Sequence, residues 1–204
     1  MPRPSDEPQR VEDEQTHGAI IAVSLVLLSG LTGHLLMQRL MAVLVAFGLP
    51  GPQAAQLVAM LHNGLVISTP SAPEGSASRL LERGVASRRA MYIVAASKRL
   101  MAGGSVAAEK RFFKAHLRAE KNRAEAVEAV DREAKRQRQA GTIGRILIGW
   151  HATLDDRTTP LCRAAHGRNF YADTPPQIGY PGTQHGGQCR CRGGKPWFGG
   201  EMLP

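Results

Sequence analysis

The sequence predicts a mainly α-helical protein that ends in a small, irregular α+β module. Aromatic residues make up only 5% of the 204 residues while Ala and Leu are abundant, and this composition favours packing between helices over a β-sandwich. Beyond Asn169 the chain is rich in Gly and Pro and shows no helical periodicity. Such a short segment buries little apolar surface, so we expect it to dock on the helices or to be held together by a bound metal.

The N-terminal third predicts a flexible arm followed by an apolar helical hairpin. Residues 1–17 are rich in Pro and in charged side chains and have no apolar periodicity, which indicates the arm. The hairpin spans residues 18–68 and consists of a long helix over 19–47 and a shorter one over 53–67. The sequence GLPGP at 48–52 separates the two helices, because proline removes backbone donors and glycine permits tight turns.

The apolar run at the start of this hairpin has two interpretations. Residues 18–38 carry no charge and are about as long as a helix that crosses a bilayer. Small and polar residues dilute the run, and no aromatic belt or basic cluster flanks it. The dilution favours a helix buried in a bundle or in a homo-oligomer interface, and membrane contact remains the alternative.

Positive charge gathers in residues 78–140, which we expect to form a basic helical stem. This segment holds sixteen basic and seven acidic side chains, and the whole chain has a net charge of +9. One helix is expected over 78–104, ending at the Gly pair, and a second from a Ser105 cap to Ala140. A basic helix is typical of a protein beside nucleic acid, and a solvated face with local ion pairs is the alternative. The candidate DNA-proximal side chains are Arg111, Lys114, Arg118 and Lys121.

The last segment, 141–204, contains all three cysteines, and their spacing predicts a zinc site. Cys189 and Cys191 lie on one face of an extended chain, and Cys162 and His166 lie on one face of a helical turn. Zinc prefers four thiolate or imidazole ligands. Two ligand sets are open: Cys162, His185, Cys189 and Cys191, or the same set with His166 in place of His185. Reduced cysteines that simply pack in a small cluster are the alternative.

No motif in the sequence indicates catalysis. The Asp155-Asp156-Arg157 turn precedes a short helix, where such residues usually cap the helix and form a local ion pair. The sequence contains no phosphate-binding loop, dinucleotide fingerprint or Ser-His-Asp elbow. We therefore do not expect an enzyme. Three cysteines cannot form a disulfide scaffold, so their number favours a reducing compartment.

The C-terminal motif resembles that of the phage Mu F-like minor head proteins, also called phage head morphogenesis proteins. The residues that carry the resemblance lie within 150–192, with weaker similarity from about residue 105. They are Trp150, the turn with Asp155 and Arg157, Cys162, Gly167, Phe170, Pro181, His185, and the Cys189-Arg190-Cys191 triplet. In this family an acidic residue usually stands where this chain has His166.

The resemblance implies a structural role in the virion head near the portal vertex. Such proteins associate with the portal protein and with major capsid or scaffold proteins during procapsid assembly in the host cytoplasm, and they contribute to forming the DNA-filled head. A basic stem would lie close to packaged DNA, and the apolar hairpin would dock on other head subunits. A zinc-held DNA-binding protein and a membrane-active virion protein that acts during genome delivery are the alternative functions.

Overall fold

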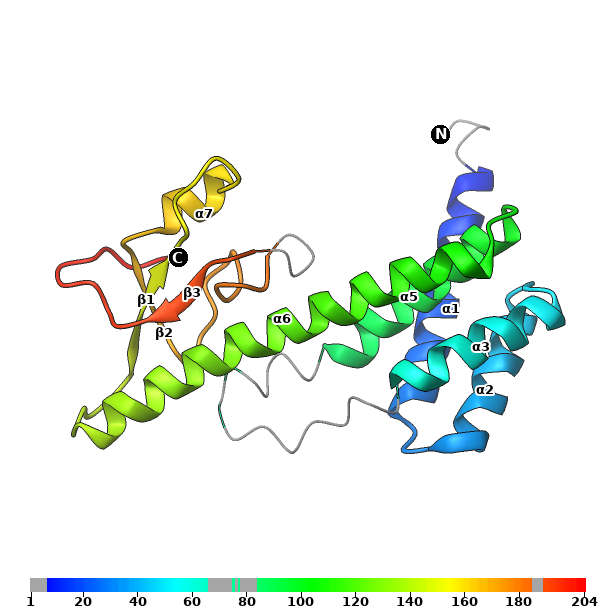
Figure 1. The fold of residues 1–204 in the computed structure, drawn as a ribbon, viewed down its shortest axis with the longest axis horizontal. Helices are drawn as coiled ribbons and strands as arrows, with labels where there is room; N and C mark the ends of the chain where they lie inside the picture. Colours follow the sequence, from blue (N-terminus) through cyan, green and yellow to red (C-terminus); the bar gives the residue numbers. More distant parts are fainter. Residues whose placement is uncertain (1–6, 66–74, 76, 78–83, 185–188) are drawn as a thin grey trace. The chain divides into compact units, whose positions relative to one another are not determined.

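The computed structural model describes residues 7–65, 75, 77, 84–184 and 189–204 (Figure 1). It confirms the predicted class, because most of these residues are helical and a small three-stranded sheet lies near the C-terminus. The chain divides into two compact units. The N-terminal unit comprises Met1–Pro70 and Gly84–His116, and the C-terminal unit comprises Ser71–Arg83 and Leu117–Pro204.

Helices alone form the described part of the N-terminal unit. They are α1 (Glu7–Leu28), α2 (Gly33–Ala46), α3 (Gly51–Leu65), α5 (Val85–Met101) and the first part of α6 (Val106–Gln139). Helix α1 packs mainly on α5, and α2 packs on α3 and α1. Fully buried leucines from α2 and α3, among them Leu40, Leu44 and Leu57, form the interior together with Ile93 of α5. None of the described helices is long and apolar enough to cross a membrane.

The structure differs from the sequence prediction at the N-terminus. Helix α1 begins at Glu7, so the predicted flexible arm over residues 1–17 is helical from Glu7 onward, and residues 1–6 lie outside the described residues. Acidic side chains in the first turns of a helix interact favourably with its dipole. Glu12 also forms an ion pair with Lys98 of α5 at 3.1 Å, which ties this end of α1 to the rest of the unit.

The predicted long helix over 19–47 is in fact two helices. Helix α1 ends at Leu28 and α2 begins at Gly33, and Gly30 between them has a φ of 72°. That left-handed conformation favours glycine and interrupts the helical hydrogen bonds. The break predicted at GLPGP is present, because α2 ends at Ala46 and α3 begins at Gly51.

Helices α5 and α6 follow the predicted stem closely where they are described. Helix α5 ends at Met101, just before the Gly pair, while residues 78–83 of the predicted helix lie outside the described residues. The Ser105 hydroxyl accepts a hydrogen bond from the backbone N–H of Ala108 at 3.2 Å, so it caps α6 as expected.

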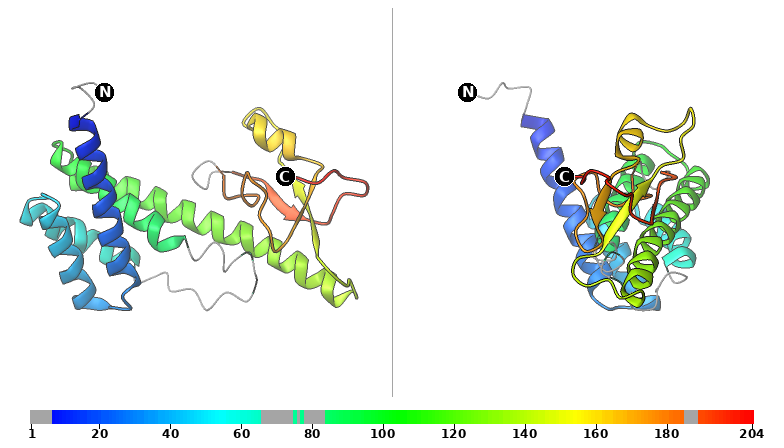
Figure 2. Two further views of the ribbon diagram at one scale, coloured as in Figure 1. Left: turned by 180° about the vertical axis from the view of Figure 1, so that it is seen from behind. Right: turned by 90° about the vertical axis from the view of Figure 1, so that its left-hand side faces the viewer.

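In the C-terminal unit a small antiparallel sheet packs against the second half of α6. Its elements are β1 (Leu147–His151), α7 (Pro160–Ala165), β2 (Asn169–Tyr171) and β3 (Arg192–Gly194), and the strand order is β2-β1-β3. Figures 1 and 2 show the sheet lying along this half of α6. The three strands and α7 give this segment the α+β character that the sequence predicted.

The core of this unit lies between α6 and the sheet. Val127, Val130 and Ala134 of α6 belong to the same buried cluster as Ile148 and Trp150 of β1. The backbone of β3 comes so close to α6 that a Cβ atom on Gly193 would lie 2.6 Å from Cγ2 of Val130. This close approach places the chain before β3, with two of the cysteines, beside the core.

Candidate metal centre

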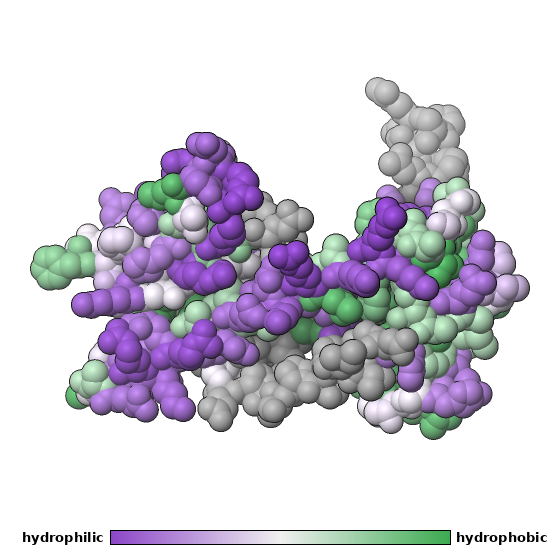
Figure 3. All heavy atoms as spheres, viewed as in Figure 1, coloured by the Kyte–Doolittle hydropathy of each residue, from purple (hydrophilic) through white to green (hydrophobic). Residues whose placement is uncertain are grey.

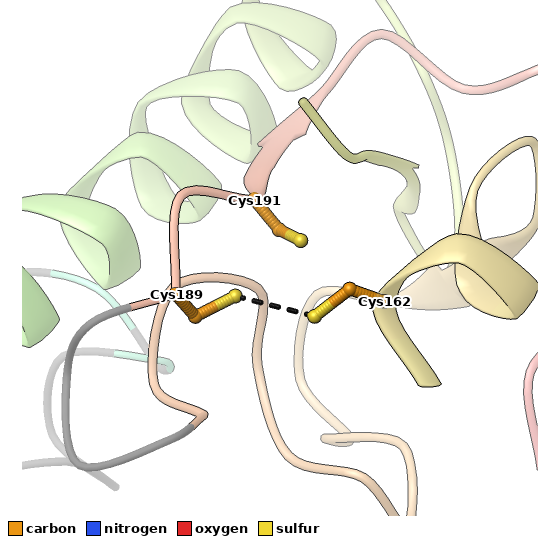
Figure 4. Close-up of side chains that lie close together, drawn as sticks. All are labelled: Cys162, Cys189 and Cys191. Atoms are coloured by element: carbon orange, nitrogen blue, oxygen red, sulfur yellow. Dashed lines mark hydrogen bonds between the residues drawn. The ribbon is translucent and has the colours of Figure 1, made fainter. Parts of the chain in front are cut away.

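Three buried cysteines meet in the C-terminal unit. Cys162 lies on α7, while Cys189 and Cys191 lie just before β3. Their sulfur atoms all lie within 4.8 Å of one another, and the Sγ atoms of Cys162 and Cys189 are 3.5 Å apart. Figure 4 shows the three side chains directed into the same space. None of the three is in a disulfide bond.

Local geometry brings these thiols together. The alternation expected for an extended chain places Cys189 and Cys191 in the cluster, while Arg190 between them is directed to a different partner. Thr159 is the N-cap of α7, and its side chain accepts a hydrogen bond from the backbone N–H of Cys162 at 3.4 Å. The cap fixes the start of the short helix that carries the third thiol.

An ion pair clamps the turn before α7 to the Cys-Arg-Cys triplet. Arg190 donates two hydrogen bonds to the carboxylate of Asp155, at 2.6 and 2.5 Å. This guanidinium holds the pKa of Asp155 well below its usual range, and the Thr158 hydroxyl adds to the effect. The expected local cap and ion pair with Arg157 is therefore only partly right. The backbone N–H of Arg157 does donate to Asp155, at 3.1 Å, but the charged partner is thirty-five residues away.

The three thiols differ in acidity. Burial raises the pKa of Cys162. The pKa of Cys189 is lowered, first by a hydrogen bond from the Cys191 thiol and also by the backbone N–H groups of Cys191 and Gly182. The same contact raises the pKa of Cys191. The thiolate is the form of cysteine that binds metals.

The dimensions of the cluster suit a tetrahedral zinc ion. A Zn–S bond of about 2.3 Å in a tetrahedron requires sulfur atoms about 3.8 Å apart. The 3.5 Å separation of Cys162 and Cys189 and the 4.8 Å limit for the whole group bracket this value. Three protein thiolates would leave a fourth coordination position. His185, the first candidate for that position, lies outside the described residues.

The structure does not bring His166, the other candidate ligand, into the cysteine group. Helix α7 ends at Ala165, so the expected i,i+4 alignment of Cys162 and His166 does not form. Instead, Nδ1 of His166 accepts a hydrogen bond from the backbone N–H of Ala152 at 3.1 Å. Its ring lies edge-on to Trp197, with the centroids 5.1 Å apart.

The cysteines line a cavity of about 270 Å³. Hydroxyl and guanidinium groups from the turn before α7 and from the triplet form its other walls. The lining residues are Thr153, Arg157, Thr158, Thr159, Cys162, Cys189, Arg190 and Cys191. The cavity would give a small ligand or a metal ion access to the thiols.

The remaining motif residues have structural explanations. Gly167 has a φ of 83° and its N–H donates to the carbonyl oxygen of Trp150 at 3.2 Å, so a left-handed residue connects α7 to β2. Trp150 is fully buried, and its ring packs edge-on to Phe170 with the centroids 6.2 Å apart. Asn169, which sequence reasoning missed, is buried, and its side chain bonds to the backbone near Trp197.

The candidate DNA-proximal side chains are all on α6, and none of them belongs to the cysteine group. All four are exposed or half-buried, at intervals of three or four residues along the helix: Arg111, Lys114, Arg118 and Lys121. This spacing places them along one side of the helix. Lys121 also lies 3.8 Å from the carboxylate of Glu125, so local ion pairing accounts for part of the charge.

Comparison with known proteins assigns the family. Neither the curated proteins nor the solved structures contain a significant match to this chain. The family described as "Phage Mu protein F like protein" matches residues 77–193, which is more than half of the chain and includes α6, the sheet and all three cysteines. It is a family of structural phage head proteins, and membership indicates association with other head components in the virion. The chain belongs to the Phage Mu protein F-like family and is a phage head morphogenesis protein.

Proposed function

We propose that this protein associates with the portal vertex and is needed for assembling procapsids that become DNA-filled heads. Its partners there would be the portal protein and the major capsid or scaffold proteins. The observation that carries the proposal is the family match over residues 77–193. The separate N-terminal unit, which lies mostly outside this match, supplies a surface through which the chain can dock.

The docking surface that we propose is an apolar stripe on α1. Ile21, Leu25 and Leu28 follow one another at helical spacing, and they are 48%, 63% and 68% exposed. Figure 3 shows that hydrophilic residues cover much of α6. Exposed apolar side chains at this spacing are typical of a helix that binds a hydrophobic groove on a partner. We assign that groove to the portal protein.

Affinity capture tests the proposal. Tagged protein is co-expressed with the other head proteins, and the captured partners are identified by mass spectrometry. We expect recovery of portal and major capsid subunits, and its loss in the double variant Leu25→Glu/Leu28→Glu. The control Gln15→Glu adds a negative charge at an exposed position of the same helix and should retain the partners. Recovery of membrane proteins or of nucleic acid alone would contradict the proposal and favour one of the alternative functions.

We further propose that the basic side of α6 lies against packaged DNA. The logarithm of DNA affinity falls linearly with the logarithm of salt concentration, and each phosphate that the protein no longer neutralises makes this slope less steep by about 0.9. Changing Arg111, Lys114, Arg118 and Lys121 to Gln should therefore reduce the slope by up to about 3.6. Arg123→Gln/Arg138→Gln removes charge from other sides of the helix and is the control. Equal slopes for the two variants would refute a DNA-facing side.

We also propose that a zinc ion bound by the cysteine group holds the irregular C-terminal segment together. We assign Cys162, Cys189 and Cys191 as ligands and His185 as the fourth. Purified protein should contain about one zinc per chain, and Cys191→Ser should lose it. His185→Gln should weaken binding, whereas His166→Gln should not, because His166 already bonds to the backbone of Ala152. Metal-free protein whose thermal melting does not respond to added zinc would exclude the site.

A further inference from the structure

Trp150 carries a buried hydrogen-bond donor that has no partner among the described residues. Its side chain is fully buried in the core of the C-terminal unit. Within the part of the chain that the structure describes, the indole Nε1 has no hydrogen-bond partner. Leaving a buried donor without an acceptor costs about 1–3 kcal/mol. A phenylalanine would fill the same core position without this cost, so the N–H group requires an explanation.

The register of the sheet places Cys191 on the same side of the sheet as Trp150. Trp150 on β1 is paired with Gly193 on β3. A Cβ atom on Gly193 would lie 3.1 Å from Cγ2 of Ile148, so Gly193 faces the core side of the sheet, the side of Ile148 and Trp150. Cys191 precedes Gly193 by two residues and therefore faces the same side. Such diagonal neighbours across two strands are within reach of an aromatic side chain.

We propose that Trp150 is a positioning residue of the metal centre and that its indole N–H donates a hydrogen bond to the sulfur of Cys191 when the thiols hold the metal. This inference rests on the zinc site proposed above. A neutral thiol is a weak acceptor, whereas a thiolate makes a charge-assisted bond about twice as strong as a neutral one. Metal binding thus gives the orphan N–H a good acceptor, and the N–H in turn orients the ligand. Groups that support a ligand in this way typically change metal affinity by about 10–100-fold.

The chain contains its own control for this bond. It has two tryptophans, and the indole N–H of the second, Trp197, donates to the carbonyl oxygen of Trp150 at 3.1 Å. A bond to a backbone carbonyl does not depend on the metal. The two indole N–H groups should therefore respond differently when the thiols bind an ion.

Nuclear magnetic resonance of the full chain loaded with ¹¹³Cd tests the bond directly. We expect the indole proton of Trp150 to move downfield on loading and to show scalar coupling to cadmium through the hydrogen bond. The indole proton of Trp197 should do neither. If cadmium does not bind, the metal centre itself is refuted. If cadmium binds and the Trp150 proton neither shifts nor couples, the metal centre stands and this inference is overturned.

A substitution gives a second readout. Trp150→Phe keeps an aromatic ring in the core and removes the donor, and we expect it to weaken metal binding about tenfold in a chelator competition. With Co²⁺ bound, the sulfur-to-metal charge-transfer band should move to longer wavelength, because the thiolate loses a stabilising hydrogen bond. Trp197→Phe should leave this band unchanged. Identical bands for wild type and Trp150→Phe would contradict the proposal even if the stability of the fold differed.

Discussion

Replacing Asn169 with Asp tests how the C-terminal segment is attached to the sheet. The Asn169 amide nitrogen donates to the carbonyl oxygens of Trp197 and Gly200, at 2.9 and 3.1 Å, and its amide oxygen accepts from the N–H of Trp197 at 2.8 Å. Its backbone N–H and carbonyl bond to Glu201 and Leu203, at 2.8 and 2.7 Å. One buried residue therefore satisfies five hydrogen bonds to the segment 197–203. The substitution keeps the shape of the side chain and removes both amide donors.

The size of the effect follows from these bonds. The Gly200 carbonyl oxygen loses the donor of Asn169, the Trp197 carbonyl oxygen keeps only the N–H of Gly200, and both then face a carboxylate at about 3 Å. An unsatisfied buried group costs about 1–3 kcal/mol. Burial of the new charge adds to this loss. We expect the C-terminal unit to lose about 3–5 kcal/mol at pH 7. For a unit of roughly one hundred residues, that loss lowers the unfolding midpoint by about 15–30 °C.

Tryptophan fluorescence is the appropriate assay, because both tryptophans, Trp150 and Trp197, lie in the C-terminal unit. The control Gln177→Glu makes the same chemical change on an exposed side chain of this unit and should alter stability by less than about 0.5 kcal/mol. Acidification should recover part of the loss in Asn169→Asp, since a protonated carboxyl group regains one donor. A midpoint within about 2 °C of the wild type at pH 7 would refute the reasoning.

Three further substitutions probe other contacts. Gly149→Ala places a Cβ atom 2.3 Å from a backbone carbonyl oxygen and should lower the free energy of unfolding by about 2–3 kcal/mol, measured by melting followed through tryptophan fluorescence. An unchanged melting midpoint would contradict this close approach of the two backbones. Arg99→Met leaves Glu109, which is only 2% exposed, without its ion-pair partner. The free energy of unfolding, followed by far-UV circular dichroism, should fall by about 2–3 kcal/mol. The double variant Arg99→Met/Glu109→Met should recover part of this loss. Arg136 donates hydrogen bonds to Glu133 and lowers the pKa of this carboxyl group in the folded state. The ionised carboxylate therefore stabilises the fold fully above about pH 4.3, the pKa of Glu in an unfolded chain. This stabilisation is lost as the pH falls through the lowered folded pKa. Glu133→Gln should therefore lose up to about 1 kcal/mol in urea unfolding at pH 7 and almost nothing at pH 2.

The sequence predicted those parts of the fold whose signals are local. The Gly pair after Met101 and the Ser105 cap marked the end of α5 and the start of α6, because both act within one helical turn. The alternation at Cys189 and Cys191 correctly placed two thiols together for the same reason. Periodicity does not tell which side of a helix its neighbours cover: Met91 of α5 is 47% exposed, whereas Ile93 and Val94 are buried.

The parts that the sequence did not predict depend on contacts between distant residues. Nothing near Asp155 indicates that its partner is Arg190, because the bond forms only when the last strand returns to the turn before α7. Strand β2 has three residues, too few for a visible alternation, and it is defined by its pairing with β1. The predicted alignment of His166 with Cys162 is wrong because α7 ends at Ala165, one residue before His166. The ends of helices can be predicted from sequence only to within a few residues.

The C-terminal unit depends on point contacts because its last part has so little regular structure. After Tyr171 the described chain contains one strand of three residues, so few backbone ladder bonds hold it to the rest of the unit. Three anchors compensate along the sequence: the thiols at 189 and 191, the ion pair of Arg190, and the hydrogen bonds from Asn169 to residues 197–203. The first two are adjacent, and both bind to the turn and helix between β1 and β2. Removing the proposed metal would therefore leave the start of β3 held by the Arg190–Asp155 ion pair alone, while Asn169 still holds the segment after β3. This explains why the motif combines a Cys-Arg-Cys triplet with an aspartate so far away in the sequence: each holds the same loop against the same helix, one through sulfur and one through charge.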